Sequence, residues 1–202
     1  MQRRRVAIMN CETHASKVQS FNALVRSMIA YTGEDPDREG LQDTPRRVRE
    51  AWGERFGGYS VDPVALLKMF EDGAQGCDEM IVVRGIPFYS HCEHHLAPFF
   101  GTATVAYIPH GRIIGLSKIN RLVDAYARRL QVQERFTNQI ADTLWAGLIP
   151  LGVGVIVRAR HLCIESRGVG QQGSIAITSA VKGAMKDDPR ARAEFLNLAN
   201  GD

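Results

Sequence analysis

The sequence has none of the long apolar segments that membrane or exported proteins carry. No apolar run in its 202 residues approaches the roughly 20 residues that a membrane-spanning helix needs. The charged start at Met1–Arg5 is not followed by the apolar stretch of a signal peptide. We therefore expect a cytoplasmic protein that has no membrane partner.

Strong charge of either sign is also missing. The formal net charge is +3, and charged residues make up 23% of the chain. This mildly basic balance is too weak to indicate a nucleic-acid partner, but it suits an anionic small substrate if the basic side chains converge. The hydrophobic content of 45% is ordinary for a soluble globular protein. A chain of this length can bury a sizeable core as one domain, with or without an appendage.

Cysteine is scarce, and the chain contains only Cys11, Cys77, Cys92 and Cys163. These residues could form two disulfides, but two of them stand beside histidines and nothing else is typical of a small secreted scaffold. A reducing compartment with metal-bound thiolates is therefore the favoured interpretation.

Metal-binding side chains are concentrated in Ser90–Leu96, which reads Ser-His-Cys-Glu-His-His-Leu. Cys92 and His95 are three positions apart, so one turn of backbone could direct both at one ion. Far downstream, His161-Leu-Cys163 offers a third ligand. Cysteine and histidine are normal zinc ligands, and three protein ligands leave the fourth tetrahedral position open for water, which is the catalytic arrangement.

Two other interpretations of this cluster stay open at this point. In one, His94 or His161 is a fourth ligand and the zinc site is closed and structural. In the other, Cys92 is a nucleophile paired with a histidine, which leaves the second cysteine without a role. An open zinc site would lower the pKa of its bound water to about 7, and the remaining histidines could transfer protons. The spacing alone therefore predicts a zinc hydrolase without naming its substrate.

Residues 1–75 are predicted to form a helical N-terminal section. Apolar residues recur with helical spacing over residues 17–31. The Thr44-Pro45 pair is a natural N-cap and first position for a second helix. The Asp62-Pro63 pair repeats this signal and predicts a short helix through Phe70.

Residues 76–202 are predicted to form an α+β domain. Met80–Tyr89 and Phe99–Ile108 are rich in residues that favour strands. Two amphipathic helices follow, and Ser117 is the expected N-cap of the first. Consecutive helices after antiparallel strands indicate a layer of helices on a sheet.

A long strand is expected over Gly152–Cys163. Because side chains alternate between the two faces of a strand, His161 and Cys163 would then project together toward one site. A last strand at residues 174–178 and a C-terminal helix capped by Asp188 complete the predicted domain.

Several longer motifs are specific enough to indicate a family. In chain order they are Thr44-Pro-Arg-Arg47, Phe88-Tyr-Ser-His-Cys-Glu-His-His95, Val105-Ala-Tyr-Ile-Pro109, Ile114-Gly-Leu-Ser-Lys-Ile-Asn-Arg121, Leu130-Gln-Val-Gln-Glu-Arg135, His161-Leu-Cys163 with Arg167-Gly-Val169, and Arg192-Ala-Glu-Phe-Leu196. Through these motifs, the chain resembles GTP cyclohydrolase I over residues 20–198.

The resemblance implies a T-fold, which is an antiparallel sheet with two helices packed on one face, preceded by a helical N-terminal section. It implies that subunits join their sheets into a barrel and form a homodecamer with active sites between subunits. The implied reaction is a zinc-dependent hydrolysis in which GTP and water give 7,8-dihydroneopterin triphosphate and formate. Synthesis of tetrahydrofolate, of biopterin and of 7-deazaguanine nucleosides begins with this step, and the sequence does not choose among them.

The resemblance also implies roles for the residues of the cluster. Cys92, His95 and Cys163 would hold the zinc ion, whose water would attack C8 of the guanine ring. His94 would protonate the imidazole portion as the ring opens. His161 would transfer protons, including at the ribose when that sugar opens and rearranges.

The implied substrate contacts come from other motifs. Glu134, with Gln133 beside it, would hold the guanine edge, where a carboxylate can accept hydrogen bonds from ring and exocyclic N–H groups. Ser117 would contact the ribose, and Glu93 would face the pocket across a subunit interface. The triphosphate would be bound by basic side chains, some from a neighbouring subunit, namely Lys118, Arg121, Arg167 and Arg47.

Two alternatives remain beside a working enzyme of this family. A non-catalytic relative would bind a nucleotide or a partner subunit and regulate it, although every expected catalytic group is present here. A related T-fold enzyme reduces the nitrile of a deazapurine with a cysteine nucleophile and NADPH, and the zinc-ligand spacing of this chain disfavours that chemistry.

Overall fold

A computed structural model describes residues 14–201 of the chain. The chain divides into two compact units, Met1–Glu54 and Arg55–Asp202. The predicted division between residues 75 and 76 stays a prediction. Within the described range, no helix is long and apolar enough to cross a membrane. Cys11 lies outside the described residues, and Cys77, Cys92 and Cys163 are free thiols.

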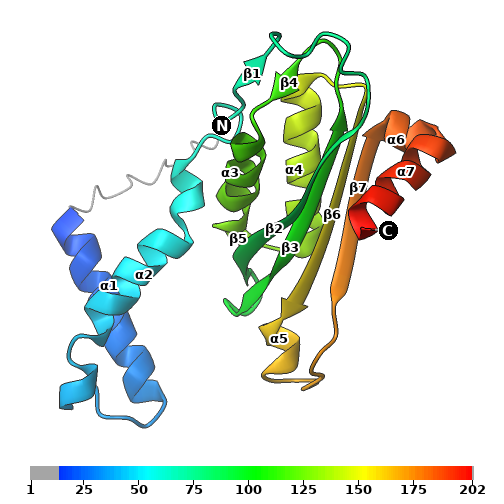
Figure 1. The fold of residues 1–202 in the computed structure, drawn as a ribbon. Coiled ribbons are helices and arrows are strands. Elements are labelled where there is room, and N and C mark those ends of the chain that lie inside the picture. The colour runs from blue at the N-terminus through cyan, green and yellow to red at the C-terminus, as the bar shows by residue number, and fades with distance from the viewer. Residues whose placement is uncertain (1–13, 202) are drawn as a thin grey trace, which may run out of the picture. The chain divides into compact units, whose positions relative to one another are not determined.

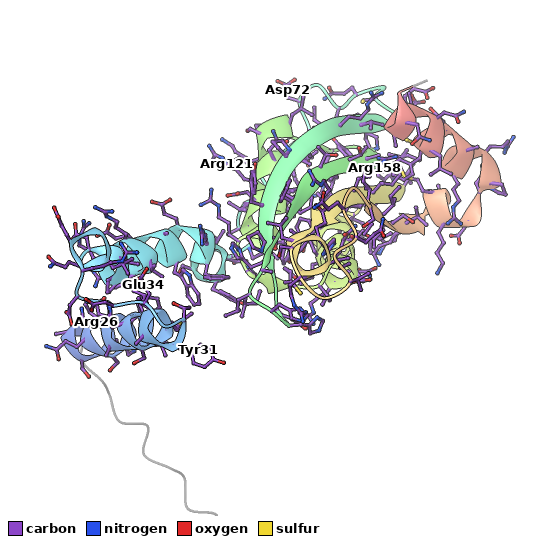
Figure 2. All side chains as sticks on the ribbon, turned by 90° about the horizontal axis from the view of Figure 1, so that it is seen from below. Arg26, Tyr31, Glu34, Asp72, Arg121 and Arg158 are labelled. Atoms are coloured by element: carbon purple, nitrogen blue, oxygen red, sulfur yellow. The ribbon has the colours of Figure 1, made fainter. Side chains whose placement is uncertain are left out.

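The first unit is a pair of helices, α1 (His14–Tyr31) and α2 (Thr44–Arg55), with the short 3-10 helix η1 (Glu39–Leu41) in their connection. Phe21 on α1 meets Trp52 on α2 edge to face, with ring centroids 5.6 Å apart. Two ion pairs hold the connecting loop, Arg26 with Asp37 and Arg38 with Glu34, and Figure 2 labels Arg26 and Glu34. Both helices were predicted, and α1 begins before the expected residue 17.

The helix expected after Asp62 is absent, and that prediction is wrong. The Asp62 carboxylate accepts a hydrogen bond from the Val64 N–H, which closes a turn instead of capping a helix. The chain then forms β1 (Met69–Phe70), which pairs with β4 (Ile113–Ile114) in a two-stranded sheet. Cap and proline signals serve turns as well as helices, and the tertiary pairing with β4 decides between them. The only regular element between α2 and β1 is the 3-10 helix η2 (Gly57–Ser60).

The second unit is built on a five-stranded sheet with the order β5-β2-β3-β6-β7 (Figure 1). Neighbouring strands are antiparallel except β5, which is parallel to the end of β2. The strands are β2 (Ile81–Cys92), β3 (Pro98–Ile108), β5 (Leu130–Gln131), β6 (Gly152–His161) and β7 (Ala176–Gly183).

Two helices, α3 (Leu116–Ala127) and α4 (Gln133–Leu148), cover one face of this sheet and form the main core with it (Figure 1). Phe99, Phe136 and Val155 are fully buried there. The expected α+β architecture, with an antiparallel sheet, two helices on one face and a helical section before it, is therefore confirmed. Ser117 does not cap α3, because the N-cap is Gly115 and makes no side-chain cap bond.

Two further helices, α6 (Ala184–Asp187) and α7 (Pro189–Asn200), pack on the opposite face. Met185 and Phe195 cover Ile156, which alternates with the core residues of β6. Asp188 caps α7 as predicted, since its side chain accepts a hydrogen bond from the Arg190 N–H at 2.8 Å.

The strand β6 ends at His161, and one helical turn, α5 (Leu162–Glu165), follows it. The expected strand through Cys163 is therefore too long by two residues. The turn is closed by a hydrogen bond from the Ser166 N–H to the Leu162 carbonyl at 3.0 Å. Strand alternation thus does not bring His161 and Cys163 together, and the helical turn directs Cys163 instead.

Candidate metal centre and the residues around it

One part of the candidate site is the turn segment, residues 92–97, which connects β2 to β3. The Cys92 N–H donates to the Ala97 carbonyl at 2.8 Å, and the Leu96 N–H donates to the Cys92 carbonyl at 2.9 Å. Leu96 closes the turn in the left-handed region, with φ of 54°. Cys92 is buried at 7% exposure, and His95 stands on the same turn.

The other part is the strand-end segment, residues 160–165, at the end of β6 and in α5. The β3–β6 register pairs His161 with Phe99, and their rings stack with centroids 4.7 Å apart. In the β2–β3 register, His91 pairs with Pro98, so β6 ends beside the turn segment on the other side of β3. Cys163 then packs, half-buried, against the core.

The two segments bring Cys92, His95 and Cys163 together. One ligand atom from each residue lies within 4.8 Å of the other two. Tetrahedral zinc with bonds of about 2.0–2.3 Å separates its ligand atoms by roughly 3.3–3.8 Å, so a small adjustment suffices. This group can hold a metal ion, and its two sulfurs and one imidazole are donors that zinc prefers. The three residues predicted as ligands are the three that the fold assembles.

The electrostatics of the group also favour a cation. Burial raises the pKa of the Cys163 thiol, and the nearby Cys92 sulfur raises it further. Two thiolates this close to each other repel, and a bound cation removes that penalty while displacing the thiol protons.

His94 lies beside the group and is exposed. Its Nδ1 is 3.7 Å from the Cys92 Sγ, and its side chain is 63% exposed. Its Nε2 lies 3.9 Å from a carboxylate oxygen of Glu93. Arg135 on α4 donates to both oxygens of Glu93 at 2.5 and 3.0 Å and lowers the pKa of that carboxyl. The negative charge of Glu93 is therefore held near His94.

His161 is oriented by Gln133, the first residue of α4. The Gln133 Nε2 donates toward the Val157 and Ala176 carbonyls and toward the Thr178 hydroxyl, each at 3.1 Å. Because the amide NH₂ must face those carbonyls, the Gln133 Oε1 faces His161, 2.7 Å from its Nε2. The neutral His161 ring therefore carries its hydrogen on Nε2 and has a free lone pair on Nδ1.

Burial and two nearby acids shift the pKa of His161 in opposite directions. Burial lowers the pKa of His161, and Glu134 and Glu165 raise it by smaller amounts. The ring is thus neutral at neutral pH and has carboxylates nearby that would stabilise its protonated form.

The remaining residues expected at the substrate lie on exposed ends of elements. Ser117, Lys118 and Arg121 are in the first turns of α3, and Figure 2 shows Arg121 on that helix. Glu134 is in the first turn of α4, and Arg167 follows α5. All are exposed except Lys118, which is half-buried. Their charged or hydroxyl ends are thus accessible to a bound molecule.

Arg47, the last of the expected phosphate contacts, belongs to the first unit. It lies on α2, where its guanidinium is 3.5 Å from the Asp43 carboxylate.

Sequence reasoning assigned no role to several residues that surround these groups. Arg135 was visible only as the last residue of a motif, and the ion pair of Arg160 with Glu165 was not foreseen. His91 packs against Phe56 with ring centroids 5.1 Å apart, and its buried Nε2 has no hydrogen-bond partner within residues 14–201. Each of these contacts joins a strand end or a turn to a helix or a loop, so only the folded structure reveals them.

Comparison with known proteins gives a consistent result. A profile of the family described as GTP cyclohydrolase I matches residues 21–200. A protein of Janthinobacterium sp. (strain Marseille) named GTP cyclohydrolase 1 is 58% identical over 174 residues, which cover 86% of this chain and 88% of that protein. Proteins with the same name from Nitrosospira multiformis and Wolinella succinogenes are 54% and 50% identical, over 90% and 85% of this chain and 93% and 91% of their own lengths.

Among solved structures, the archaeosine synthase QueF-Like in the apo form is similar with a TM-score of 0.42 and 20% sequence identity. The likeness covers 52% of this chain and 93% of that one.

Proposed function

Because the chain belongs to the GTP cyclohydrolase I family, we propose that it is a zinc enzyme that converts GTP and water to 7,8-dihydroneopterin triphosphate and formate. The family membership predicted from the motifs is confirmed. The observation that carries the proposal is the three-ligand group of Cys92, His95 and Cys163, with His94 beside Cys92 and with His161 two residues before Cys163.

Cys92, His95 and Cys163 would hold the zinc ion. Their number supports a catalytic site more than a structural one, because a tetrahedral ion would keep one open position. Zinc bound there would supply Lewis-acid chemistry and lower the pKa of water, so that hydrolysis can run at neutral pH.

His94 is suited to give a proton to the imidazole portion of guanine as its ring opens. It is exposed, it lies beside the metal group, and its Nε2 is 3.9 Å from a carboxylate oxygen of Glu93. Arg135 holds Glu93 in place through two hydrogen bonds. A histidine so placed can serve as a general acid in the turnover.

His161 is suited to accept a proton and return it, including during the rearrangement of the ribose. Its Nδ1 carries the lone pair, so the proton is taken up at that atom. The Nε2 hydrogen stays on its bond to Gln133 throughout, which keeps the ring from turning. We therefore propose that Gln133 acts on the substrate through His161, because all its amide atoms already have partners in the protein.

Glu134 would bind the guanine edge, where its two oxygens can accept from N1–H and the exocyclic amine. Ser117 would contact the ribose. The triphosphate would be neutralised by Lys118, Arg121, Arg167 and Arg47. As in the expectation from sequence, we propose a cytoplasmic homodecamer in which some of these residues and Glu93 reach a site across a subunit interface.

The test is to incubate the purified chain with GTP and to measure formate, dihydroneopterin triphosphate and bound zinc on one sample. We expect turnover with about one zinc per subunit and loss of turnover after chelation. His94→Ala should keep its zinc but lose formate release by about 10²–10⁴-fold, the usual contribution of a general acid.

His110→Ala is the matched control, because His110 is exposed in the turn between β3 and β4 and should be silent. A folded, zinc-loaded protein that binds GTP without releasing formate would contradict the proposal and support the non-catalytic alternative.

A further inference from the structure

Arg160 and Glu165 form an ion pair that brackets the strand-end segment. The Arg160 Nε donates to one oxygen of Glu165 at 3.0 Å, and its Nη2 donates to the other at 2.6 Å. The Glu165 side chain is 6% exposed and the Arg160 side chain is 49% exposed. This two-pronged geometry fixes direction as well as distance. The residues enclosed by the pair include His161 and Cys163.

The segment needs such a link because α5 is a single turn. A helix of four residues has too few internal hydrogen bonds to be stable alone. The loop that follows it, residues 166–175, is exposed and contains Gly168, Gly170 and Gly173 in the left-handed region. Glu165 therefore stands at the junction between a weak helical turn and an exposed loop, and Arg160 ties that junction to β6.

Arg160 lies on the face of the sheet opposite α3 and α4. Its guanidinium carbon lies 5.8 Å from the centre of the Phe100 ring, which is its register partner on β3. Phe100 in turn stacks on its own partner Tyr89 of β2, with ring centroids 5.4 Å apart. The row Tyr89–Phe100–Arg160–Glu165 thus runs from the strand that ends at Cys92 to the turn that carries Cys163.

We propose that Arg160 and Glu165 are positioning residues for the ligand Cys163, and that they hold α5 so that its sulfur faces Cys92 and His95 before a metal ion arrives. The inference rests on the proposed metal centre. Neither residue touches the metal group in this role. Without this ion pair, α5 becomes ordered only when the metal binds. The entropy cost of that ordering then weakens metal binding.

The experiment measures zinc affinity of the full chain by competition with a chromophoric chelator. The variants are Glu165→Gln, Arg160→Met, the double variant, and Arg160→Lys. The last keeps the positive charge but cannot donate two parallel hydrogen bonds to the carboxylate. We expect each of the first two to weaken zinc binding by about 10–100-fold. The double variant should match the single ones within about threefold, because they remove one shared link. Arg160→Lys should fall between wild type and Arg160→Met.

Asp142→Asn is the matched control. It removes an ion pair of similar length, with Lys182 at 2.6 Å, that joins α4 to β7 and lies outside both segments. It should leave zinc affinity unchanged. The sulfur-to-metal charge-transfer absorption of the cobalt-loaded protein gives a second signal, which should weaken in Glu165→Gln at limiting cobalt and recover at saturation.

The outcomes separate the inference from the function on which it rests. A wild-type chain that binds no zinc overturns the metal centre and this inference with it. Tight zinc binding by wild type with unchanged affinity in Glu165→Gln overturns the inference alone, and so does an equal loss in Asp142→Asn or additive losses in the double variant. If Glu165→Gln fails to fold, the affinity of Arg160→Lys relative to wild type decides the question.

Discussion

The turn segment and the strand-end segment supply the same metal group in different ways. The turn segment carries Cys92 and His95 and is closed by its own backbone hydrogen bonds between β2 and β3. The strand-end segment carries Cys163 and reaches the group only because β6 pairs with β3 in a particular register. A local turn costs little chain entropy to close, whereas the distant segment depends on the whole sheet and needs side-chain links to hold it.

The largest expected effect comes from removing a ligand of either segment. Cys163→Ser and Cys92→Ser should both abolish zinc binding and turnover. The loss should exceed the roughly 100-fold that follows when a residue hydrogen-bonded to a metal ligand is removed. Zinc content after dialysis and formate release measure this. Cys77→Ser is the control, since Cys77 is a free thiol outside the group. Equal losses would show that the two segments contribute equally once the group is assembled. Zinc retention with full activity in Cys163→Ser would refute its assignment as a ligand.

An intermediate effect is expected from Gln133→Met, which frees His161 without touching a metal ligand. Turnover should fall by about 100-fold, the scale of a misplaced catalytic group, while zinc content stays normal. Nitrogen NMR of labelled histidine should show that the Nε2–H form of His161 is no longer favoured.

Gln139→Met is the control, because Gln139 lies on the same helix and pairs with Gln131 instead. Unchanged turnover in Gln133→Met, or a parallel loss of zinc, would show that His161 does not depend on this amide.

The smallest effect is expected from Asp188→Ala, which acts on α7, a helix on the opposite face of the sheet from α3 and α4. Loss of the N-cap should lower the melting temperature by about 2–4 °C and leave zinc binding and turnover unchanged.

The same variant tests a pH dependence. The backbone N–H of Arg190 lowers the pKa of Asp188 below its usual 3.8, and the Arg190 side chain adds to this. The folded state thus favours the carboxylate, so the capping contribution is complete above pH 3.8 and disappears as the pH falls through the lowered value. The difference in melting temperature between wild type and Asp188→Ala should shrink below that pH, and a difference that is the same at every pH would contradict the capping role.

The sequence by itself determined the elements whose signals are local. The apolar spacing of α1, the Thr44-Pro45 start of α2 and the Asp188 cap of α7 each depend on a few neighbouring residues, and all three helices formed. Their starts differ slightly from the prediction, because α1 begins at His14 and Thr44 is the first residue of α2 instead of its N-cap. The proximity of Cys92 and His95 could be predicted for the same reason, because residues three apart on one turn are neighbours in almost any fold.

The tertiary structure decided the features that depend on how distant strands pair. The Asp62-Pro63 signal was overruled by the pairing of β1 with β4. The prediction extended the strand to Cys163, but β6 ends at His161 and α5 begins at the next residue. The alternation of side chains continues only while a strand has a partner strand. After His161 the chain instead forms a helical turn, which the Arg160–Glu165 pair ties to β6.

The tautomer of His161 could not be read from the sequence either. It follows from two backbone carbonyls on β6 and β7 that orient the Gln133 amide. Those carbonyls belong to residues far apart along the chain, and only the folded sheet places both within reach of one side chain. Local spacing thus identified the groups that can bind a metal, and long-range strand pairing set their directions.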